Sequence, residues 1–156
     1  MMGRQDSMQL TLFSDYALRT LIYLGSHPGK VIPASAISDA FGISSDHVAK
    51  AGKWLTQRGY VSALRGKTGG LSLARTPSSI RIGQLITETE PNMDLIECFD
   101  SATNRCPLTP SCKLKKALYQ ARHAFVAALD EYTLADLLSN APELVQLLDA
   151  AALRRR

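Results

Sequence analysis

The pattern of apolar positions predicts three helices in the N-terminal part of the chain. Over residues 14–26, apolar side chains recur at the three- and four-residue steps of an α-helix, and Ser14 is a suitable N-cap. A shorter helix is expected over residues 33–41, because it begins at a proline, which fits a first helical position. A tight turn at residues 42–44 then leads into a third helix over residues 45–58.

The third of these helices has two different faces. Val48, Ala51 and Leu55 follow the helical repeat and form an apolar stripe for the core. Trp54 fits either a core position or a position at the edge of a groove. A short helix, a tight turn and a helix with one basic face are typical of a helix-turn-helix. The stripe opposite the core consists of His47, Lys50, Lys53 and Gln57.

A β-hairpin is predicted directly after the helix-turn-helix. Two short runs of strand-forming residues, 60–64 and 71–74, flank a glycine-rich loop. Arg65 and Lys67 lie in that loop, so the hairpin would be a wing with a basic tip. The loop lacks the spacing of a phosphate-binding Walker motif, which argues against nucleotide binding.

The chain continues with shorter elements. A short helix is expected over residues 82–90, and residues 98–112 are expected to be irregular because two prolines interrupt them. Thr133 and Asp136 have the spacing of a capping box for another short helix. Pro142 is placed to begin a last one.

A long helix with a narrow apolar seam is predicted over residues 113–132. Its apolar positions alternate between steps of four and three residues, which is the heptad pattern of a coiled coil. A long helix of this kind on a small chain indicates a dimer interface, and packing against its own domain is the alternative. The seam consists of Leu114, Leu118, Ala121, Phe125, Ala128 and Tyr132.

These elements predict a mostly α-helical fold with a small β-hairpin. It would consist of a winged helix-turn-helix DNA-binding domain over residues 8–90 and a loop over residues 91–112, which holds the three cysteines and is the candidate cluster-binding loop. The dimerisation helix and the short helix after it would span residues 113–140. Residues 141–156 are assigned to a C-terminal tail.

Composition and charge narrow the class of protein. The chain has 156 residues, of which 46% are hydrophobic and 21% charged, as in ordinary globular domains. We find no apolar run of membrane-spanning length and no secretory leader, so we expect a cytoplasmic protein with no membrane partner. The net charge is +4, and residues 44–75 hold six Lys or Arg against a single acid. This basic segment indicates a localised anion-binding surface, although a solvated face has the same composition.

The three cysteines lie close together in the sequence, at Cys98, Cys106 and Cys112. An odd number of cysteines without a leader argues against a disulfide framework. Thiolates are ligands for iron–sulfur clusters and for zinc, but the close cysteine pair usual in zinc sites is absent. The residues alone leave an iron–sulfur cluster, zinc, and redox or inert thiols open.

Several segments together resemble one family. The segments are MQLTLFSDYALRTLIYL, LRGKTGGLSLAR, IRIGQLITETEP, CPLTPSCKLKKAL and LDEYTLADL, and they cover most of the chain from Met8 to Leu138. They are similar to the winged-helix iron–sulfur transcriptional regulators of the NsrR/IscR/RirA family. Within this family the likeness is greatest to the nitric-oxide-sensing repressors of the NsrR type.

The resemblance implies a cluster site. Cys98, Cys106 and Cys112 match the family's three thiolate ligands, and Asp15 matches a fourth ligand that reaches over from the partner subunit. A 4Fe–4S cluster is expected, and an aerobic preparation can lack it. Lys115 stands where IscR-type proteins have a histidine, which argues against that type of site. The seven residues between the first two cysteines resemble the iron-responsive RirA type instead.

The expected function is that of a homodimeric repressor on an inverted-repeat operator in double-stranded DNA, released by nitric oxide. An iron-responsive RirA-like regulator and a cluster-free thiol redox sensor are the alternatives. An enzyme is not expected, because no catalytic motif is visible. Ser44 and Ser45 are placed to bind a phosphate at a helix N-terminus. The remaining candidate DNA contacts are His47, Lys50, Lys53 and Gln57 on the third helix and Arg65 and Lys67 on the wing.

Overall fold

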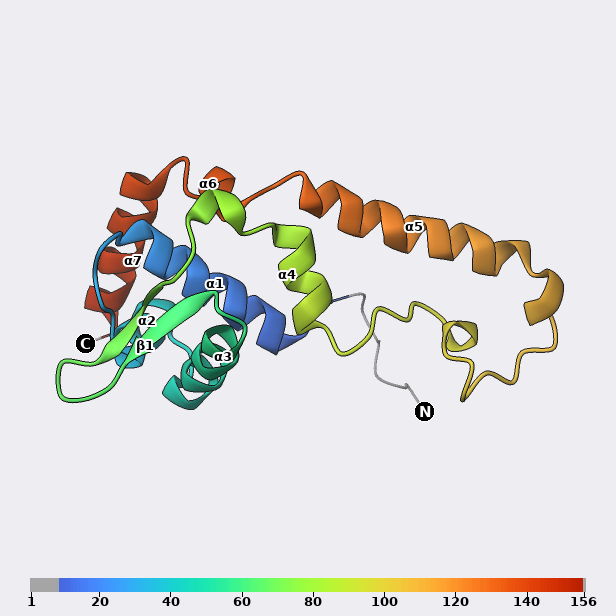
Figure 1. Ribbon diagram of the computed structural model, residues 1–156, viewed down its shortest axis with the longest axis horizontal. Helices are drawn as coiled ribbons and strands as arrows, with labels where there is room; N and C mark the ends of the chain where they lie inside the picture. The colour runs from blue at the N-terminus through green and yellow to red at the C-terminus, as the bar shows by residue number, and fades with distance from the viewer. Residues whose placement is uncertain (1–8, 156) are drawn as a thin grey trace.

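The computed structural model describes residues 9–155 and consists of a winged-helix body and a long helical arm (Figure 1). The expected start of the DNA-binding domain at Met8 lies outside the described residues. The mostly helical fold with one two-stranded antiparallel hairpin confirms the predicted fold class. The helices and strands are α1 (Leu12–Ser26), α2 (Ala34–Phe41), α3 (Ser45–Gln57), β1 (Val61–Leu64), β2 (Gly70–Leu73), α4 (Ile82–Thr89), α5 (Lys113–Asp130), α6 (Leu134–Leu137) and α7 (Ala141–Arg154), with 3-10 turns η1 (Pro77–Ser79), η2 (Glu97–Phe99) and η3 (Thr109–Ser111).

Helix α1 begins two residues earlier than the sequence predicted. Thr11 is the N-cap, and its hydroxyl accepts a hydrogen bond from the Ser14 backbone N–H at 3.2 Å. Ser14, predicted to be the cap, is instead fully buried in the first turn and faces Thr89 of α4. Both residue types can cap a helix, and the contact with α4 decides between them.

The core lies where α1, α2, α3, the hairpin and α6 meet. The predicted apolar stripe of α3 is confirmed, because Val48, Ala51 and Leu55 are all 0% exposed. Leu71 of β2 packs over Gly52, where a Cβ would come within 2.7 Å of the leucine side chain. This close approach fixes the hairpin against α3, the predicted recognition helix. Other core side chains are Leu21, Ile37, Tyr60, Ile80, Leu85 and Leu134.

The hairpin has the predicted form. β1 and β2 pair antiparallel, with Val61 opposite Leu73 and Leu64 opposite Gly70. The loop between them turns at Gly66, whose φ of 107° is a conformation that side-chain-bearing residues rarely adopt. Ile32 adds a backbone bridge to Leu71, which ties the hairpin to the segment before α2.

Helix α5 leaves the body as an arm, and the chain segment before it runs outward beneath it (Figure 1). None of the 18 residues of α5 is buried. Its C-terminal end is attached to α4, because Asp130 accepts a hydrogen bond from the Gln84 backbone N–H at 2.7 Å. The capping box predicted for Thr133 and Asp136 is present at the start of α6.

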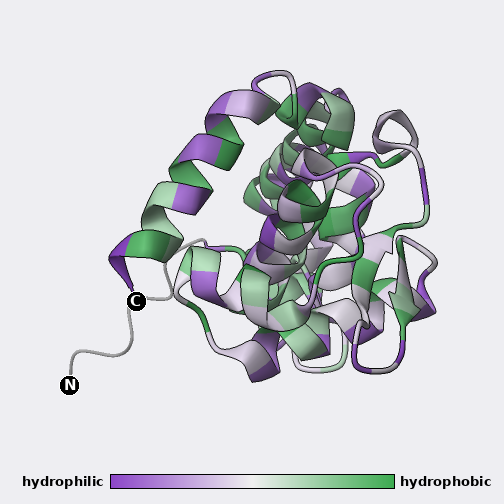
Figure 2. Cartoon of the chain, turned by 90° about the vertical axis from the view of Figure 1, so that its left-hand side faces the viewer, coloured by the Kyte–Doolittle hydropathy of each residue, from purple (hydrophilic) through white to green (hydrophobic). Residues whose placement is uncertain are grey.

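The segment assigned to a C-terminal tail forms a helix that returns to the body. Helix α7 has Pro142 in its first turn, as the sequence indicated, and it lies against α1 and α2. Figure 2 shows hydrophobic and hydrophilic residues alternating along this helix up to the C label. Leu148 packs against the core from it. None of the helices in the described part of the chain is both long and apolar enough to cross a membrane.

Candidate functional site

The structure brings the predicted recognition residues together on one exposed face of α3. Ser44, the N-cap, uses its hydroxyl to accept a hydrogen bond from the Asp46 backbone N–H at 3.2 Å. Because the opposite stripe is buried in the core, the polar stripe must project outward. A helix of 13 residues presented in this way has the size and polarity to enter a DNA major groove. The exposed residues are Ser44, Ser45, His47, Lys50, Lys53 and Gln57.

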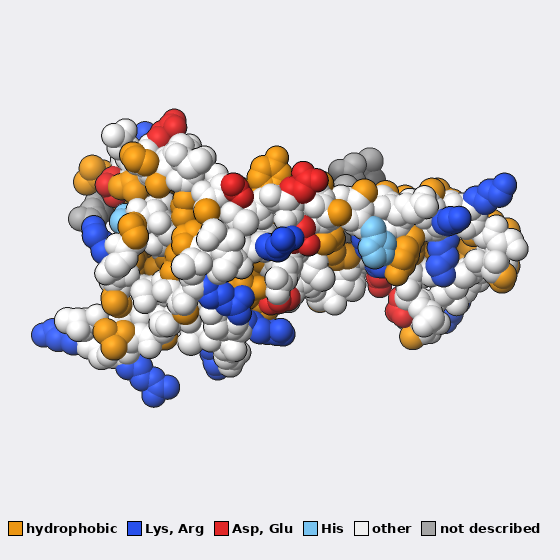
Figure 3. Space-filling model, turned by 45° about the horizontal axis from the view of Figure 1, so that its top comes forward, with side chains coloured by type: hydrophobic (Ala, Val, Ile, Leu, Met, Phe, Trp, Pro, Cys, Tyr) orange, Lys and Arg blue, Asp and Glu red, His pale blue; other side chains and the backbone are white. Residues whose placement is uncertain are grey.

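The wing carries a second basic group. Arg65 and Lys67 are exposed in the loop between β1 and β2. Lys and Arg side chains project from the wing end of the molecule, at the lower left of Figure 3. Since Leu71 seats the hairpin on Gly52 of α3, the wing and the recognition helix form one unit. Such a unit can contact neighbouring parts of one duplex.

Two arginines outside the predicted set of DNA contacts lie at the base of the wing, and one of them, Arg75, holds it by hydrogen bonds. Arg75 donates hydrogen bonds to the carbonyl oxygens of Gly59 at 3.0 Å and Arg58 at 2.8 Å. Its guanidinium also lies 4.3 Å from the centre of the Tyr60 ring. The Arg58 guanidinium lies 5.2 Å from the centre of the ring of Trp54, which precedes it by one helical turn. That four-residue spacing of an aromatic and a cation is the sequence signal that identifies the pair.

Trp54 joins α3 to its neighbours. Its ring is half-buried, with the Tyr60 ring stacked at 6.3 Å and the Phe13 ring of α1 edge-on at 5.8 Å. Burial raises the pKa of Tyr60, and the nearby Glu88 carboxylate raises it further. The tyrosine therefore stays protonated and donates to Glu88 at 3.1 Å. Trp54 is thus a packing residue between α1 and the wing.

The first turn of α1 links the recognition helix to the end of α4. Glu90 accepts hydrogen bonds from the Thr11 backbone N–H at 2.9 Å and its hydroxyl at 3.1 Å, and from the Ser14 hydroxyl. On the other side of α1, the Tyr16 ring lies 5.5 Å from the His47 ring of α3. Glu90 directly precedes the segment that holds the cysteines. The N-terminal end of α1, from Thr11 to Tyr16, therefore contacts both α3 and Glu90, the residue before the cysteine segment.

The three thiols lie on the segment beneath the arm, and all three are free. Cys98 is buried in η2, whereas Cys106 and Cys112 are half-buried. Cys112 caps α5, because its sulfur accepts a hydrogen bond from the Lys115 backbone N–H at 3.4 Å.

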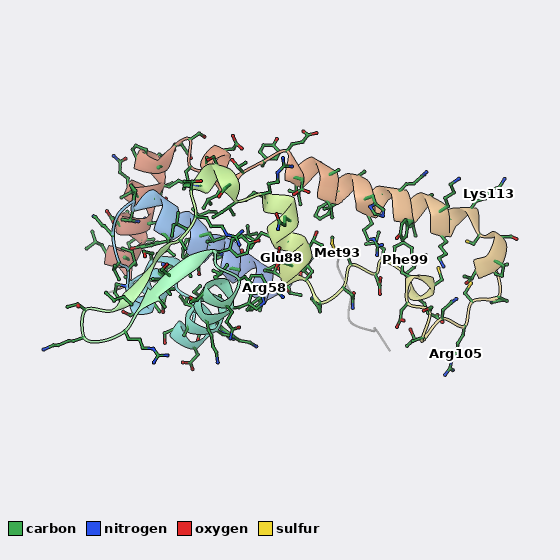
Figure 4. All side chains as sticks on the ribbon, viewed as in Figure 1. Arg58, Glu88, Met93, Phe99, Arg105 and Lys113 are labelled. Carbon is green, nitrogen blue, oxygen red and sulfur yellow. The ribbon has the colours of Figure 1, made fainter. Side chains whose placement is uncertain are left out.

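Aromatic and charged contacts fasten this segment to α5. Phe99, labelled between the loop and the arm in Figure 4, has its ring 5.6 Å from that of Tyr119. Arg122 lies 4.9 Å from the Phe99 ring centre and 3.4 Å from the Asp94 carboxylate. Arg105 points away on the outer side of the loop (Figure 4). Cys98 is therefore anchored through its neighbour Phe99, while the rest of the loop is held mainly by its own turns.

The four predicted cluster ligands are not gathered within one chain. Among residues 9–155, no three His, Cys, Asp or Glu side chains form a group that could hold a metal ion. Asp15 forms a two-point ion pair with Arg19, at 2.8 and 2.9 Å, which is the i,i+4 pairing that its position also allowed. The donor chemistry nevertheless fits an iron–sulfur cluster, because three free thiols lie on one short loop and Cys112 stands at a positive helix end.

The comparisons with known proteins decide the family. The family model described as Rrf2, iron-dependent transcriptional regulator, matches residues 10–140. The chain belongs to the Rrf2 family. The family resemblance found in the sequence is thereby confirmed. The prediction of a DNA-binding regulator rather than an enzyme is confirmed as well, because Rrf2 proteins are transcriptional regulators.

Solved structures agree with this Rrf2 assignment at the level of the fold. CymR, the global cysteine regulator of B. subtilis, is 24% identical with a TM-score of 0.70, over 86% of this chain and 98% of that one. IscR of T. potens is 24% identical with a TM-score of 0.67, over 91% and 93%. The oxidized form of Staphylococcus aureus CymR is 23% identical with a TM-score of 0.66, over 85% and 97%. The winged-helix architecture is therefore shared with all three.

Proposed function

We propose that this Rrf2 protein is a homodimeric repressor whose affinity for its operator is controlled by an iron–sulfur cluster that reacts with nitric oxide. Operator recognition would use the exposed face of α3, with Lys50 and Lys53 on phosphates or guanine edges and Gln57 on a base edge. Arg65 and Lys67 would contact the adjacent backbone or the minor groove. Because DNA is the target, we place the protein in the cytoplasm.

The dimer is supported by the exposed seam of α5. Leu114, Phe125 and Tyr132 of the predicted heptad are 61%, 40% and 52% exposed. A groove of about 640 Å³, lined by Leu10, Leu118, Phe125 and residues 90–96, lies beside the seam. Apolar side chains repeated along one helix face favour a second copy of the same helix. A two-fold dimer would place two α3 helices on an inverted-repeat operator.

The cluster would be held by Cys98, Cys106 and Cys112 of one chain and by Asp15 of the partner subunit. When bound, it supplies an iron corner with a carboxylate ligand, which is open to nitric oxide. The exposed Asp15–Arg19 pair is weak, so little free energy opposes a new partner for that carboxylate. The three thiols are free and lie on a loop of short turns, so a cluster could bind all three of them.

The observation that carries the regulatory proposal is the contact made by the first turn of α1. Glu90 ties this turn to the segment with the thiols, and Tyr16 ties it to His47 of the recognition helix. A change in the thiol segment that displaced Glu90 would free the Thr11 cap. The tilt of α1 against α3 would then change, and with it the spacing of the two recognition helices in the dimer.

A thiol sensor without a cluster is the second candidate. It is favoured by two findings: the three thiols do not form a metal-holding group within the described residues of the single chain, and the chain is similar to CymR, described in B. subtilis as the global cysteine regulator. A cysteine that changes its oxidation state on the same segment would act through the same Glu90 contact.

The test is purification without oxygen, followed by an iron count and a DNA-binding titration with nitric oxide. The probe is a duplex selected by the protein from a random library. About four irons per chain and loss of binding at low nitric oxide support the proposal. Loss of binding on iron chelation alone indicates the RirA-like iron sensor, and a colourless protein that responds to peroxide indicates the thiol sensor.

The DNA-contact face has its own matched control. Replacing Lys50 by Ala is expected to lower the salt dependence of binding by about one counterion. Replacing Lys116 of α5 by Ala removes the same charge far from α3 and is expected to leave the salt dependence unchanged. Equal effects of the two variants would contradict the assignment of α3 as the DNA-binding face.

A further inference from the structure

The last helix of the chain holds the turn between the two helices of the helix-turn-helix. Helix α7 packs on α1, where Leu148 joins the core and Asp149 lies near Tyr23. Burial raises the pKa of Tyr23, and the Asp149 carboxylate raises it further, so the tyrosine stays neutral. Its ring packs edge-on against Phe41, the last residue of α2, at 6.2 Å. This packing brings the end of α7 to the end of α2.

At that point Arg155 binds the exposed carbonyl end of α2. Its Nη1 donates to the carbonyl oxygen of Ala40 at 2.5 Å and to that of Asp39 at 3.2 Å. The last four carbonyls of a helix have no partner within the helix. A guanidinium there supplies donors and a charge that complements the negative helix end.

The turn itself is shaped to admit this side chain. Gly42 has a φ of 64°, and a Cβ on it would come within 2.6 Å of Arg155 Nε. From the inside, Ser38 holds the same turn, because its hydroxyl donates to the Ile43 carbonyl at 2.7 Å. The next residue, Ser44, is the N-cap of α3. The turn is therefore fixed on both sides immediately before the recognition helix begins.

We propose that Arg155 is a positioning residue for operator binding, which fixes the α2–α3 turn and thereby the direction in which α3 projects. The inference rests on the proposed role of α3 in DNA binding. Helix α7 lies beyond residues 10–140, the part matched by the family model. In this proposal Arg155 acts through the protein backbone, because its Nη1 donates to two carbonyl oxygens of α2.

The neighbouring Arg154 is a matched control. It has the same charge and is exposed, and its guanidinium has no hydrogen bond or ion pair within the described residues. With a duplex selected from a random library by the parent protein, Arg155→Ala is expected to bind about tenfold more weakly, the scale of one lost charge-assisted hydrogen bond. The salt dependence is expected to stay that of the parent. Arg154→Ala is expected to bind as the parent does, and Arg155→Lys to recover part of the loss.

Two results of this titration would overturn the proposal. One is equal weakening by Arg154→Ala and Arg155→Ala, which would mean that only the charge matters. The other is a fall in salt dependence by about one counterion in Arg155→Ala, which would mean that the arginine binds a phosphate directly.

A second measurement needs no DNA and separates this inference from the proposed function. Hydrogen exchange of the Ile43 amide, which donates to Ser38, is expected to be about tenfold faster in Arg155→Ala than in the parent. Exchange of the Leu55 amide in α3 is expected to be unchanged, which excludes general destabilisation. Unchanged exchange at Ile43 overturns the proposal. Failure of the parent to select any duplex refutes the DNA-binding proposal and leaves the exchange result to decide the role of Arg155.

Discussion

Asp15 pairs with Arg19 in the structure and is the fourth cluster ligand in our proposal. Its ion pair with Arg19 has good two-point geometry, but the two side chains are 37% and 39% exposed. Exposed i,i+4 pairs stabilise a helix by only about 0.2–0.5 kcal/mol. The Arg19 guanidinium also lies 5.6 Å from the Phe41 ring centre, so it keeps a packing role without Asp15. Removal of the carboxylate should therefore cost little stability and reveal any second role.

We expect Asp15→Ala to lower the free energy of unfolding by less than about 0.5 kcal/mol through loss of this pair. Arg19→Ala should lower it somewhat more, because it also removes the contact with Phe41. Only Asp15→Ala should lower the iron retained under anaerobic purification and change the response to nitric oxide, because Arg19→Ala keeps the carboxylate. Iron assay and urea unfolding on the three proteins test this. If Asp15→Ala retains iron, operator binding and the nitric oxide response like the parent, Asp15 is only an N-terminal acid of α1.

The structural roles of some residues could be predicted from the sequence, and those of others could not. Thr133 and Asp136 were predicted correctly, because a capping box is complete within four residues. The cap of α1 was wrong, because Ser14 and Thr11 are equivalent locally and only Thr89 and Glu90, distant in the sequence, distinguish them. The ligand set of three cysteines and Asp15 stays a prediction, because within the described residues of the single chain these side chains do not form a metal-holding group.

At the scale of elements, the short helix α6 depends on its capping box. Asp136 accepts from the Thr133 backbone N–H and hydroxyl, both at 2.7 Å. The backbone hydrogen bond, with help from the hydroxyl, holds the pKa of Asp136 below its ordinary value of 3.8. The helix places Leu134 in the core, where it is 0% exposed, and leads to α7.

We expect Asp136→Asn to lower the urea midpoint at pH 7, with a difference from the parent that shrinks as the pH falls below about 4. The direction follows because the unfolded chain takes up the proton at a higher pH than the folded chain. The stabilisation by the Asp136 carboxylate is thus fully present above the pKa of this group in the unfolded chain. It is lost as the pH falls through the pKa of the group in the folded chain. Urea titrations from pH 7 to pH 2.5 measure it, with Glu131→Gln as an exposed neighbouring control. A difference that is constant over this range would refute the expectation.

The elements themselves were largely predictable, because each has its own signal. The buried stripe of α3, the glycine turn of the wing and the heptad of α5 are local patterns. The packing of α7 could not be predicted, because its contacts join Leu148 to the core and Arg155 to α2, more than a hundred residues away in the sequence. The spacing of apolar residues in a sequence predicts that a segment is helical, but it does not tell which other part of the protein packs against that helix.

At the scale of the whole molecule, the arm formed by α5 exposes an apolar surface that a second copy of the chain could cover. Helix α5 has no buried residue, although it carries an apolar seam beside an apolar groove. The winged-helix body has its own core, in which the buried side chains of α1 to α4 and α6 meet. A change on the α5 seam should therefore affect association without unfolding the body.

We expect Phe125→Asp to convert a dimer into a monomer of 17.0 kDa, since a charge at the centre of the seam would be buried against its copy. The helical circular dichroism should be preserved, because Phe125 is 40% exposed in the single chain. Ala127→Asp adds the same charge on the opposite face and should remain dimeric. Light scattering after size-exclusion chromatography measures the mass.

The same two variants connect the dimer to DNA recognition. A monomer contacts one half-site, so Phe125→Asp should lose the gain in affinity that comes from binding both half-sites together, at least tenfold, on a duplex with the inverted repeat. On a duplex with a single half-site, the two variants should bind alike, because each keeps the face of α3 and the wing. A dimeric Phe125→Asp would place the interface elsewhere. A monomer that binds the inverted repeat as tightly as Ala127→Asp would show that operator recognition does not depend on pairing through α5.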